Sequence, residues 1–502
     1  MNLNNIKLIN DDQGIVNLII NSKNTLINAE FINDFKKSID FISNKKEIKG
    51  IIISTDHNNY NYDYDLNFIF SLENSESIFN TITKLSKTLR KLETLGKPIV
   101  SIVKGKIKLG GLEIILHSHY RIAQEGSDTK FYFKNTKYSI IPAIGGTQRL
   151  PRQIGINESI NLFLSDKTIS AEEALQLNLV NEIADENQLV NKAKEYIIKN
   201  PQSLQNWDNK KLINSQPNPF SAKNLGYFIT KIAALHADTS NHYPSVKILI
   251  SSIYEGLNTD INSGLKIEAR NFTWLTQNSE TQSMFETLVL HSHLSKFKDE
   301  VIKKFKNSFE ENYAAEGVRL LLSGVSAALI ENAGRRLDFK SGPLEFADKL
   351  EIQCVINQLD STDASTASLI RSMQKINRNG LSNNKGFYDY KDGKKNLWPD
   401  LTDLVPMSKI QPSVKEVERR LLYSSINNIF YNYFKYSDFK NPEVCDYMVV
   451  KNIGFPVWTG GAFQWVKRNG INEFINENDE YAKTLGSRFV LNEKIINIIK
   501  TI

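Results

Sequence analysis

Residues 104–148 read KGKIKLGGLEIILHSHYRIAQEGSDTKFYFKNTKYSIIPAIGGTQ, and this stretch decides the fold of the N-terminal part of the chain. The glycine pair Gly110-Gly111 opens an apolar helical run that carries one carboxylate, Glu113. The first turn of a helix leaves main-chain N–H groups free, and glycine lets a ligand approach them closely. A carboxylate in that turn lies where it can act as an acid or base, although the spacing alone also fits a structural charge at a helix N-terminus.

The composition bounds the class of protein. The chain has 502 residues, of which 41% are hydrophobic and 24% charged, and a small net charge of +6. These values predict a globular protein of several domains without the basic stripe that nucleic-acid binding requires. The two cysteines fit neither a zinc site nor a disulfide framework, which favours a reducing compartment. With no secretory signal and no apolar run long enough to span a membrane, we expect a cytoplasmic protein.

The order of local patterns predicts two kinds of architecture. Residues 14–20, 49–54 and 98–103 are short apolar runs typical of strands, and residues 29–42 have the periodicity of an amphipathic helix. Strand–helix alternation up to about residue 190 predicts an α/β layer fold. Beyond that point strand signals fade and helical periodicity dominates.

The Gly110-Gly111-Leu112-Glu113 turn and the Gly145–Arg152 run, GGTQRLPR, resemble the crotonase (enoyl-CoA hydratase/isomerase) family. The resemblance implies an α/β crotonase domain of the spiral ββα type over residues 1–190. It also implies acyl-CoA or enoyl-CoA thioesters as substrates, with Glu113 as a catalytic acid/base. By the same resemblance, the main-chain amides of Gly110 and Tyr64 form the oxyanion hole.

Two positions depart from the family pattern. The second catalytic carboxylate of the family aligns with Asn135, which cannot transfer a proton at neutral pH but can orient a water molecule. Asp63 replaces a glycine in the turn before Tyr64, and its side chain is expected to crowd the ligand or the turn. Loss of one positioned acid/base group lowers a rate by about 10²- to 10⁴-fold, so we expect a weakened or absent hydratase. His117 and His119 do not share a helical face, and we expect surface or interface residues rather than metal ligands.

The C-terminal half resembles parts of multifunctional fatty-acid β-oxidation enzymes, in their order. Residues 191–307, with the run Glu268–Phe272, resemble their helical linker. Residues 308–404 resemble the all-α C-terminal domain of 3-hydroxyacyl-CoA dehydrogenases, and residues 413–502 resemble a second copy. The runs that carry this resemblance are EGVRLL from Glu316, GPLEFAD from Gly342, KGFYDY from Lys385 and GFPVWTGGAF from Gly454. From their residue types alone, these runs are mostly turns and helix starts with a structural role. Trp458, Phe463 and Trp465 are predicted to lie in the core.

No part of the sequence resembles the NAD-binding domain of those enzymes. No Gly-x-Gly occurs in the chain, so the dinucleotide fingerprint is absent. We therefore expect no cofactor other than the CoA moiety of the substrate, no metal and no NAD-dependent dehydrogenase activity. Three hypotheses remain. The first is an impaired hydratase/isomerase. The second is a non-catalytic acyl-CoA-binding or scaffold subunit that docks thiolase, a dehydrogenase partner or a second copy, and the third is another single-carboxylate acyl-CoA reaction such as hydrolysis.

Overall fold

The computed structural model describes the chain except residues 22–24, 57–58, 127, 134–139, 166, 213–215, 290–296, 360–362, 437–438 and 440. It divides into two compact units. Unit 1 comprises Met1–Leu235 and Tyr243–Thr281, and unit 2 comprises His236–His242 and Gln282–Ile502. The domain boundaries expected from the sequence stay predictions.

Unit 1 alternates strands and helices. Its elements are β1 (Ile6–Asn10), β2 (Ile15–Ile20), β3 (Leu26–Ile27), α1 (Ala29–Ser43), β4 (Gly50–Thr55), β5 (Asp63–Tyr64), α2 (Leu66–Phe70), α3 (Ser75–Glu93), β6 (Ile99–Val103), β7 (Lys106–Ile107), α4 (Leu109–Ile115), β8 (Tyr120–Gln124), β9 (Lys130–Tyr132), α5 (Gly146–Ile154), α6 (Ile156–Leu164), β10 (Thr168–Ser170), α7 (Ala171–Gln176), β11 (Glu182–Ala184), α8 (Leu189–Lys199), α9 (Ala222–Thr239), α10 (Pro244–Leu257) and α11 (Ile261–Thr276). The α/β prediction for this part of the chain is confirmed.

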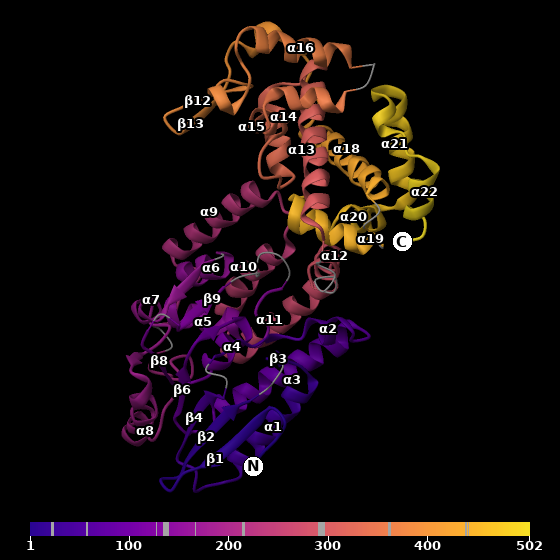
Figure 1. Cartoon of the computed structure of the whole chain (residues 1–502). Helices are drawn as coiled ribbons and strands as arrows, with labels where there is room; N and C mark the ends of the chain where they lie inside the picture. Colours follow the sequence, from indigo (N-terminus) through magenta and orange to yellow (C-terminus); the bar gives the residue numbers. More distant parts are fainter. Residues whose placement is uncertain are drawn as a thin grey trace. The chain divides into compact units, whose positions relative to one another are not determined.

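The main sheet has six strands in the order β1-β2-β4-β6-β8-β11, parallel except for β1 (Figure 1). Successive side chains of a strand point to opposite faces. Ile51 and Ile53 of β4 therefore belong to the core that contains α1 and α3, while Ile52 packs in a second core with α8. Both faces are covered, which is why these strands are continuous apolar runs.

The glycine pair Gly110-Gly111 brings α4 against the strand β5 and the residues before it. The Gly111 N–H donates to the Tyr62 carbonyl at 3.1 Å. A Cβ at Gly111 would lie 2.1 Å from the Tyr60 carbonyl oxygen, and one at Gly110 would lie 3.0 Å from the Tyr62 oxygen. Only glycine allows this approach, which places the first turn of α4 beside Tyr64.

Helices α10 and α11, from the segment that resembles a linker, pack onto α5 and complete unit 1. The Gln148 amide of α5 inserts between them and donates to the Ser252 carbonyl at 2.9 Å. A Cβ at Gly256 or Gly264 would lie 2.0 or 2.5 Å from the Gln148 side-chain oxygen. The Gly145–Arg152 run therefore forms the surface on which these two helices pack.

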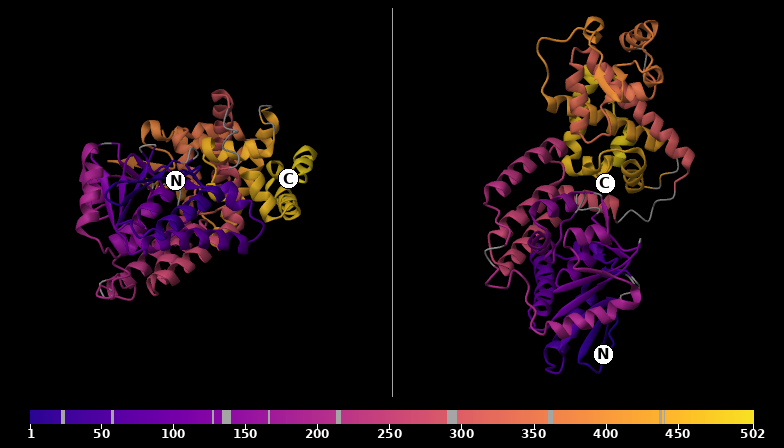
Figure 2. Two further views of the ribbon diagram at one scale, coloured as in Figure 1. Left: turned by 90° about the horizontal axis from the view of Figure 1, so that it is seen from below. Right: turned by 90° about the vertical axis from the view of Figure 1, so that its left-hand side faces the viewer.

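Unit 2 is mostly helical, as predicted. Its elements are α12 (Ser279–Leu288, mostly in this unit), α13 (Asp299–Leu322), α14 (Ala327–Arg336), α15 (Pro343–Lys349), α16 (Ala364–Lys375), β12 (Tyr388–Lys391), β13 (Lys394–Leu397), α17 (Leu401–Leu404), α18 (Val414–Lys435), α19 (Pro442–Met448), α20 (Ala462–Asn469), α21 (Ile471–Leu485) and α22 (Glu493–Ile499). The long helix α13 contacts α14, α15, α16 and α18 (Figures 1 and 2).

One hairpin departs from the all-α prediction. Strands β12 and β13 pair antiparallel across Asp392-Gly393, whose φ angles are 51° and 72°. Two central residues with positive φ are typical of a type I′ turn, for which Asp-Gly is a preferred sequence. The sequence therefore contains a local signal for this hairpin, the dipeptide Asp392-Gly393.

Unit 2 twice uses a buried carboxylate to cap a helix that follows a glycine. Glu331 of α14 accepts the Leu344 N–H of α15 at 2.7 Å. Asp446 of α19 accepts the Phe463 and Gln464 N–H groups of α20 at 3.0 and 2.9 Å. A Cβ at either preceding glycine, Gly342 or Gly461, would lie 2.3 Å from its carboxylate group. Trp458, Phe463 and Trp465 are buried around the second copy of this arrangement, as predicted.

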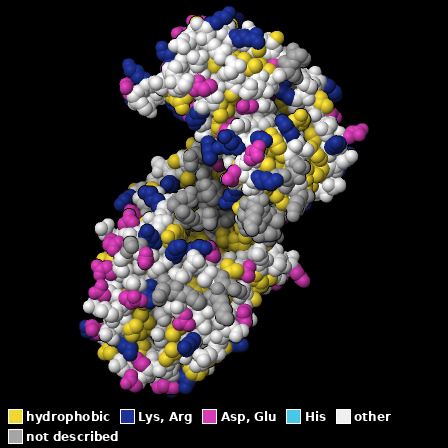
Figure 3. Space-filling view, in the orientation of Figure 1, with side chains coloured by type: hydrophobic (Ala, Val, Ile, Leu, Met, Phe, Trp, Pro, Cys, Tyr) yellow, Lys and Arg dark blue, Asp and Glu magenta, His cyan; other side chains and the backbone are white. Residues whose placement is uncertain are grey.

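The surface carries both charge signs. On the face that Figure 3 draws, Lys and Arg side chains are interspersed with Asp and Glu. This mixture accords with the small net charge of +6.

We predict that Gly111→Ala lowers the free energy of unfolding by about 3 kcal/mol, because the new methyl group has no space against the Tyr60 carbonyl. Gly226→Ala is the matched control. Gly226 lies on an exposed part of α9 with nothing within 4 Å of its Cβ position. This substitution should stabilise the protein by up to about 1 kcal/mol. Urea denaturation measures both, and equal midpoints would contradict the close approach of α4.

Candidate active site

Five successive main-chain amides, from Ala143 to Thr147, donate to three buried side chains of other elements. These acceptors are Tyr64 of β5, Glu113 of α4 and Glu268 of α11. The bonds run from Ala143 to the Tyr64 hydroxyl at 2.9 Å, from Ile144 and Gly146 to Glu113 Oε1 at 2.9 and 2.8 Å, from Gly145 to Glu268 Oε1, and from Thr147 to Glu268 Oε2 at 2.7 Å. Amides that converge at a helix N-terminus form an anion-binding concavity. Here the anions are side chains of the protein itself.

Glu113 has an environment suited to proton transfer at neutral pH. Its side chain is 0% exposed, and burial raises the pKa of its carboxyl group to about 7 against the hydrogen bonds from Tyr64, Ile144 and Gly146. An acid/base group works best when its pKa lies near the operating pH. However, both carboxylate oxygens are engaged, so a substrate must displace a bond to reach them.

Glu268 is a second buried carboxyl group at the site, and the sequence analysis assigned it no role. Its Oε2 also accepts the Thr147 hydroxyl. Burial and the nearby charge of Glu113 raise its pKa to about 8. The one signal in the sequence was its place on the apolar face of α11, beside Leu265 and Phe272 at helical spacing. A carboxylate on such a face requires a partner from another element.

Tyr64 occupies the site with its side chain. Its hydroxyl donates to Glu113 Oε2, and its ring lies 5.8 Å from the Phe272 ring centroid. The residue is 3% exposed. Its main-chain amide, the predicted oxyanion donor, instead donates to Asp63 Oδ1 at 3.3 Å. The Asp63 side chain thus takes the position at this amide where an acyl oxygen would bind.

Gly110 supplies the other predicted oxyanion donor. It lies in the first turn of α4, and within the described part of the chain its N–H makes no hydrogen bond. Lys108, the residue before α4, also offers no side-chain cap. The role of the Gly110 amide as an oxyanion donor stays a prediction.

Asn135, the predicted replacement for the second carboxylate, lies outside the described residues. The surface or interface location expected for the two histidines is wrong for His117, which is fully buried, and stays a prediction for His119, which is partly exposed. The chain after α4 turns inward to β8, so His117 is fully buried with Nδ1 against the Glu113 carbonyl, and His119 accepts the Ile99 N–H. Within the described ranges, no group of His, Cys, Asp and Glu side chains could hold a metal ion.

A buried ion pair fixes the position of α5, the helix at the end of the row of amides. Arg149 of α5 makes two hydrogen bonds with Glu93 of α3, at 2.7 and 3.1 Å, and neither side chain is exposed. Arg90 adds a third bond to the same carboxylate at 2.9 Å. Such bidentate contacts fix the orientation of the helices that carry them. They hold α5, and with it the turn that binds Glu113.

Part of the chain is similar to known proteins. Residues 11–207 match the model of the enoyl-CoA hydratase/isomerase family. Unit 1 therefore contains a crotonase domain. The chain is 26% identical to the fatty acid oxidation complex subunit alpha of Vibrio vulnificus over 287 residues, which cover 56% of this chain and 40% of that protein. It is also 26% identical to the protein of the same name from Idiomarina loihiensis, over 57% of this chain and 41% of that protein.

The match thus spans about two fifths of the length of these relatives. Among solved structures, the enoyl-CoA hydratase of Bacillus anthracis aligns over 57% of this chain and 95% of its own, with 20% identity and a TM-score of 0.36. The enoyl-CoA hydratase of Bacillus halodurans aligns over 55% and 97%, with 21% identity and a TM-score of 0.40.

The paired carboxyl groups predict a pH-dependent stability. Their folded-state pKa values, about 7 and about 8, exceed the ordinary value of 4.5. The folded protein therefore binds more protons than the unfolded chain, and its stability falls as the pH rises from about 5 to about 8. We predict that Glu268→Gln makes this fall shallower, because one proton linkage is removed. Thermal melts of the two proteins across this pH range measure the effect.

The matched control is Glu255→Gln on the exposed side of α10, where the carboxylate pairs with Arg270. Its pH dependence should equal that of the unmodified protein. The same slope in Glu268→Gln would show that Glu268 does not titrate with the fold.

Proposed function

We propose that this chain is a homologue of fatty-acid β-oxidation multifunctional enzymes that acts on acyl-CoA thioesters. Its crotonase domain would perform enoyl-CoA hydratase/isomerase-type chemistry at a reduced rate. One observation carries the proposal: the Glu113 carboxyl group, with a pKa of about 7, lies in the same helical turn as the free Gly110 amide. Thioester enolisation needs an acid/base and an oxyanion donor close together, and these two groups are the candidates for those roles.

In this mechanism the thioester oxygen accepts the Gly110 N–H, which stabilises negative charge as the enolate forms. Glu113 then removes or returns the proton at the neighbouring carbon. A single carboxylate can carry both steps of a double-bond shift. Hydration also requires an activated water, and for that step Asn135 offers only a hydrogen bond that orients the water.

Tyr64 supplies a physical reason for the reduced rate. The acyl group needs the space beside Glu113 Oε2, where the Tyr64 hydroxyl donates its hydrogen bond. Asp63 likewise competes for the Tyr64 amide. The free energy of displacing both contacts adds to the barrier of every turnover.

A second candidate is a non-catalytic acyl-CoA-binding or scaffold subunit that docks a thiolase, a dehydrogenase partner or a second copy of itself. The complete burial of Glu113 favours it. Melting with excess acyl-CoA separates the two candidates. Stabilisation by mass action together with loss of the enoyl-CoA absorbance supports the enzyme. Stabilisation without turnover supports the binding protein.

We predict that Tyr64→Ala raises the rate on a short 2-enoyl-CoA by about tenfold or more, because it frees Glu113 Oε2 and the space of the ring.

Glu113→Gln should abolish activity, and Asn135→Glu should raise it by about 10²-fold by restoring a second acid/base group. Loss of the conjugated thioester absorbance measures each rate. Tyr62→Phe, which removes a hydroxyl bonded to the Ile20 carbonyl, is the control and should leave the rate unchanged.

Activity that survives Glu113→Gln would show that the domain works without this carboxylate. A Tyr64→Ala variant that is folded and no faster than the parent would remove Tyr64 as the cause of a slow rate.

We further propose that residues 308–404 and 413–502 are two copies of a dehydrogenase C-terminal-like helical domain without an NAD-binding partner in this sequence. No helix in the described ranges is long and apolar enough to cross a bilayer. A cytoplasmic location is part of the same proposal.

Calorimetric titration with NADH should therefore give no binding, and 3-hydroxyacyl-CoA should not be oxidised, because the Gly-x-Gly turn that receives the pyrophosphate is absent. Micromolar affinity for NADH would overturn this assignment.

A further inference from the structure

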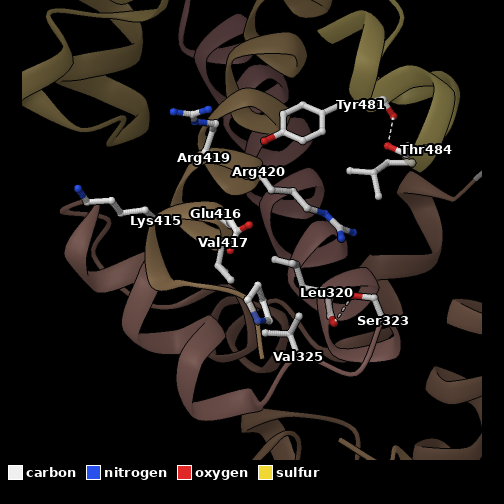
Figure 4. A pocket seen from close by; sticks show the side chains of 12 residues that line it. Leu320, Ser323, Val325, Lys415, Glu416, Val417, Arg419, Arg420, Tyr481 and Thr484 are labelled. Atoms are coloured by element: carbon white, nitrogen blue, oxygen red, sulfur yellow. Dashed lines mark hydrogen bonds between the residues drawn. The ribbon is translucent and has the colours of Figure 1, made fainter. Parts of the chain in front are cut away.

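Unit 2 contains a pocket of about 630 Å³ between the end of α13, the start of α18 and the end of α21. Aliphatic side chains form much of its wall: Leu320, Val325, Val417 and Leu485. In Figure 4 the Arg420 side chain extends to the right between Tyr481 and Leu320, whereas Lys415 and Arg419 extend to the left. The volume lies in the range of small-molecule sites.

A buried carboxylate fixes Arg420 in this position. Glu316 of α13 is 0% exposed, and its Oε1 accepts Arg420 Nε at 2.6 Å. Arg488 adds bonds to both oxygens at 2.7 and 3.2 Å, and Arg319 adds a longer one at 3.4 Å. Burial alone would raise the pKa of Glu316, but the guanidinium groups of Arg420 and Arg488 overcome it and hold the pKa at about 2.

Among the residues that the structure describes, this network keeps one positive charge without a counter-charge. It joins three guanidinium groups to two carboxylates, Glu316 and Asp363, the latter bound by Arg319. At the rim, Arg419 pairs with Glu477, and the Glu416 carboxylate accepts the Ser413 N–H at the start of α18. Lys415, the chain neighbour of Glu416, carries the opposite formal charge. The rim charges therefore balance one another.

The open donors of the network face the pocket. Arg420 uses only its Nε on Glu316, and within the described part of the chain its two terminal nitrogens make no hydrogen bond. The side chain is 11% exposed. A guanidinium group held by its Nε and free at both Nη atoms presents the fork that binds an oxyanion with two parallel hydrogen bonds.

We propose that this pocket binds a small amphipathic carboxylate, with its head on the Arg420 fork and its aliphatic body against the Leu320, Val325, Val417 and Leu485 wall. A single negative charge matches the one uncompensated positive charge of the network, which favours a carboxylate over a doubly charged phosphate monoester. The apolar wall supplies affinity by removing aliphatic surface from water. The site is separate from Glu113 and does not depend on the chemistry of the crotonase domain.

Calorimetric titration of the full-length protein with octanoate tests the proposal. Octanoate should bind at least about tenfold more tightly than octanol, which lacks the charge, and than acetate, which lacks the body. Octyl phosphate should bind more weakly than octanoate. Equal affinity for octanoate and octanol would overturn the role of the fork, and tighter binding of octyl phosphate would overturn the choice of a carboxylate.

Two variants locate the site. Arg420→Met should weaken octanoate binding by about ten- to a hundredfold, since it removes a charged hydrogen-bonding partner. The matched control Arg419→Met, one position away and paired with Glu477, should change it by less than about twofold. Thr484→Trp fills the pocket without touching the Arg–Glu network, so it decides the matter if Arg420→Met fails to fold. Octanoate binding that persists unchanged in Thr484→Trp would show that the ligand binds elsewhere and would overturn the proposal.

Discussion

The row of amides from Ala143 to Thr147 is the constraint on which unit 1 depends. Five consecutive buried N–H groups at the start of α5 need acceptors, and three distant elements provide them. An unsatisfied buried N–H costs about 1–3 kcal/mol. The helix α5, the site helix α4 and the added helix α11 are thereby tied to one turn, so the arrangement of the site and the docking of α10 and α11 cannot vary independently.

The same need explains why the site is closed. The Glu113 carboxylate accepts hydrogen bonds from two amides of the row and from the Tyr64 hydroxyl. In a pocket with bound ligand, the second oxygen would face the reacting carbon. Here an aromatic side chain of the protein fills that space. Glu113 is therefore held as part of the core, with its second carboxylate oxygen bound by the Tyr64 hydroxyl.

Buried carboxylates on main-chain amides recur in unit 2, where Glu331 and Asp446 each cap a helix that follows a glycine. Burial raises the pKa of both groups, and for Asp446 the value is about 8. Glu316 is the opposite case, because arginines rather than amides surround it and its pKa is lowered. The amide-bound carboxylates satisfy backbone donors, whereas the arginine-bound one organises charge toward a pocket. This difference in partner separates the structural carboxylates of this unit from the one beside a candidate ligand site.

The sequence by itself determined the elements whose signals are local. Apolar runs located the strands β2, β4 and β6 of the main sheet, the Gly110–Glu113 turn located the start of α4, and helical periodicity separated the second half from the first. The absence of Gly-x-Gly is likewise a property of the sequence alone. The tertiary structure alone decided that the Tyr64 side chain, not only its amide, reaches Glu113, that Glu268 joins the site, and that His117 is buried. These contacts join residues 49 to 123 positions apart or depend on where the chain turns after α4. Periodicity shows which face of an element is apolar, but which distant acceptor satisfies a buried amide depends on how the packed elements cross.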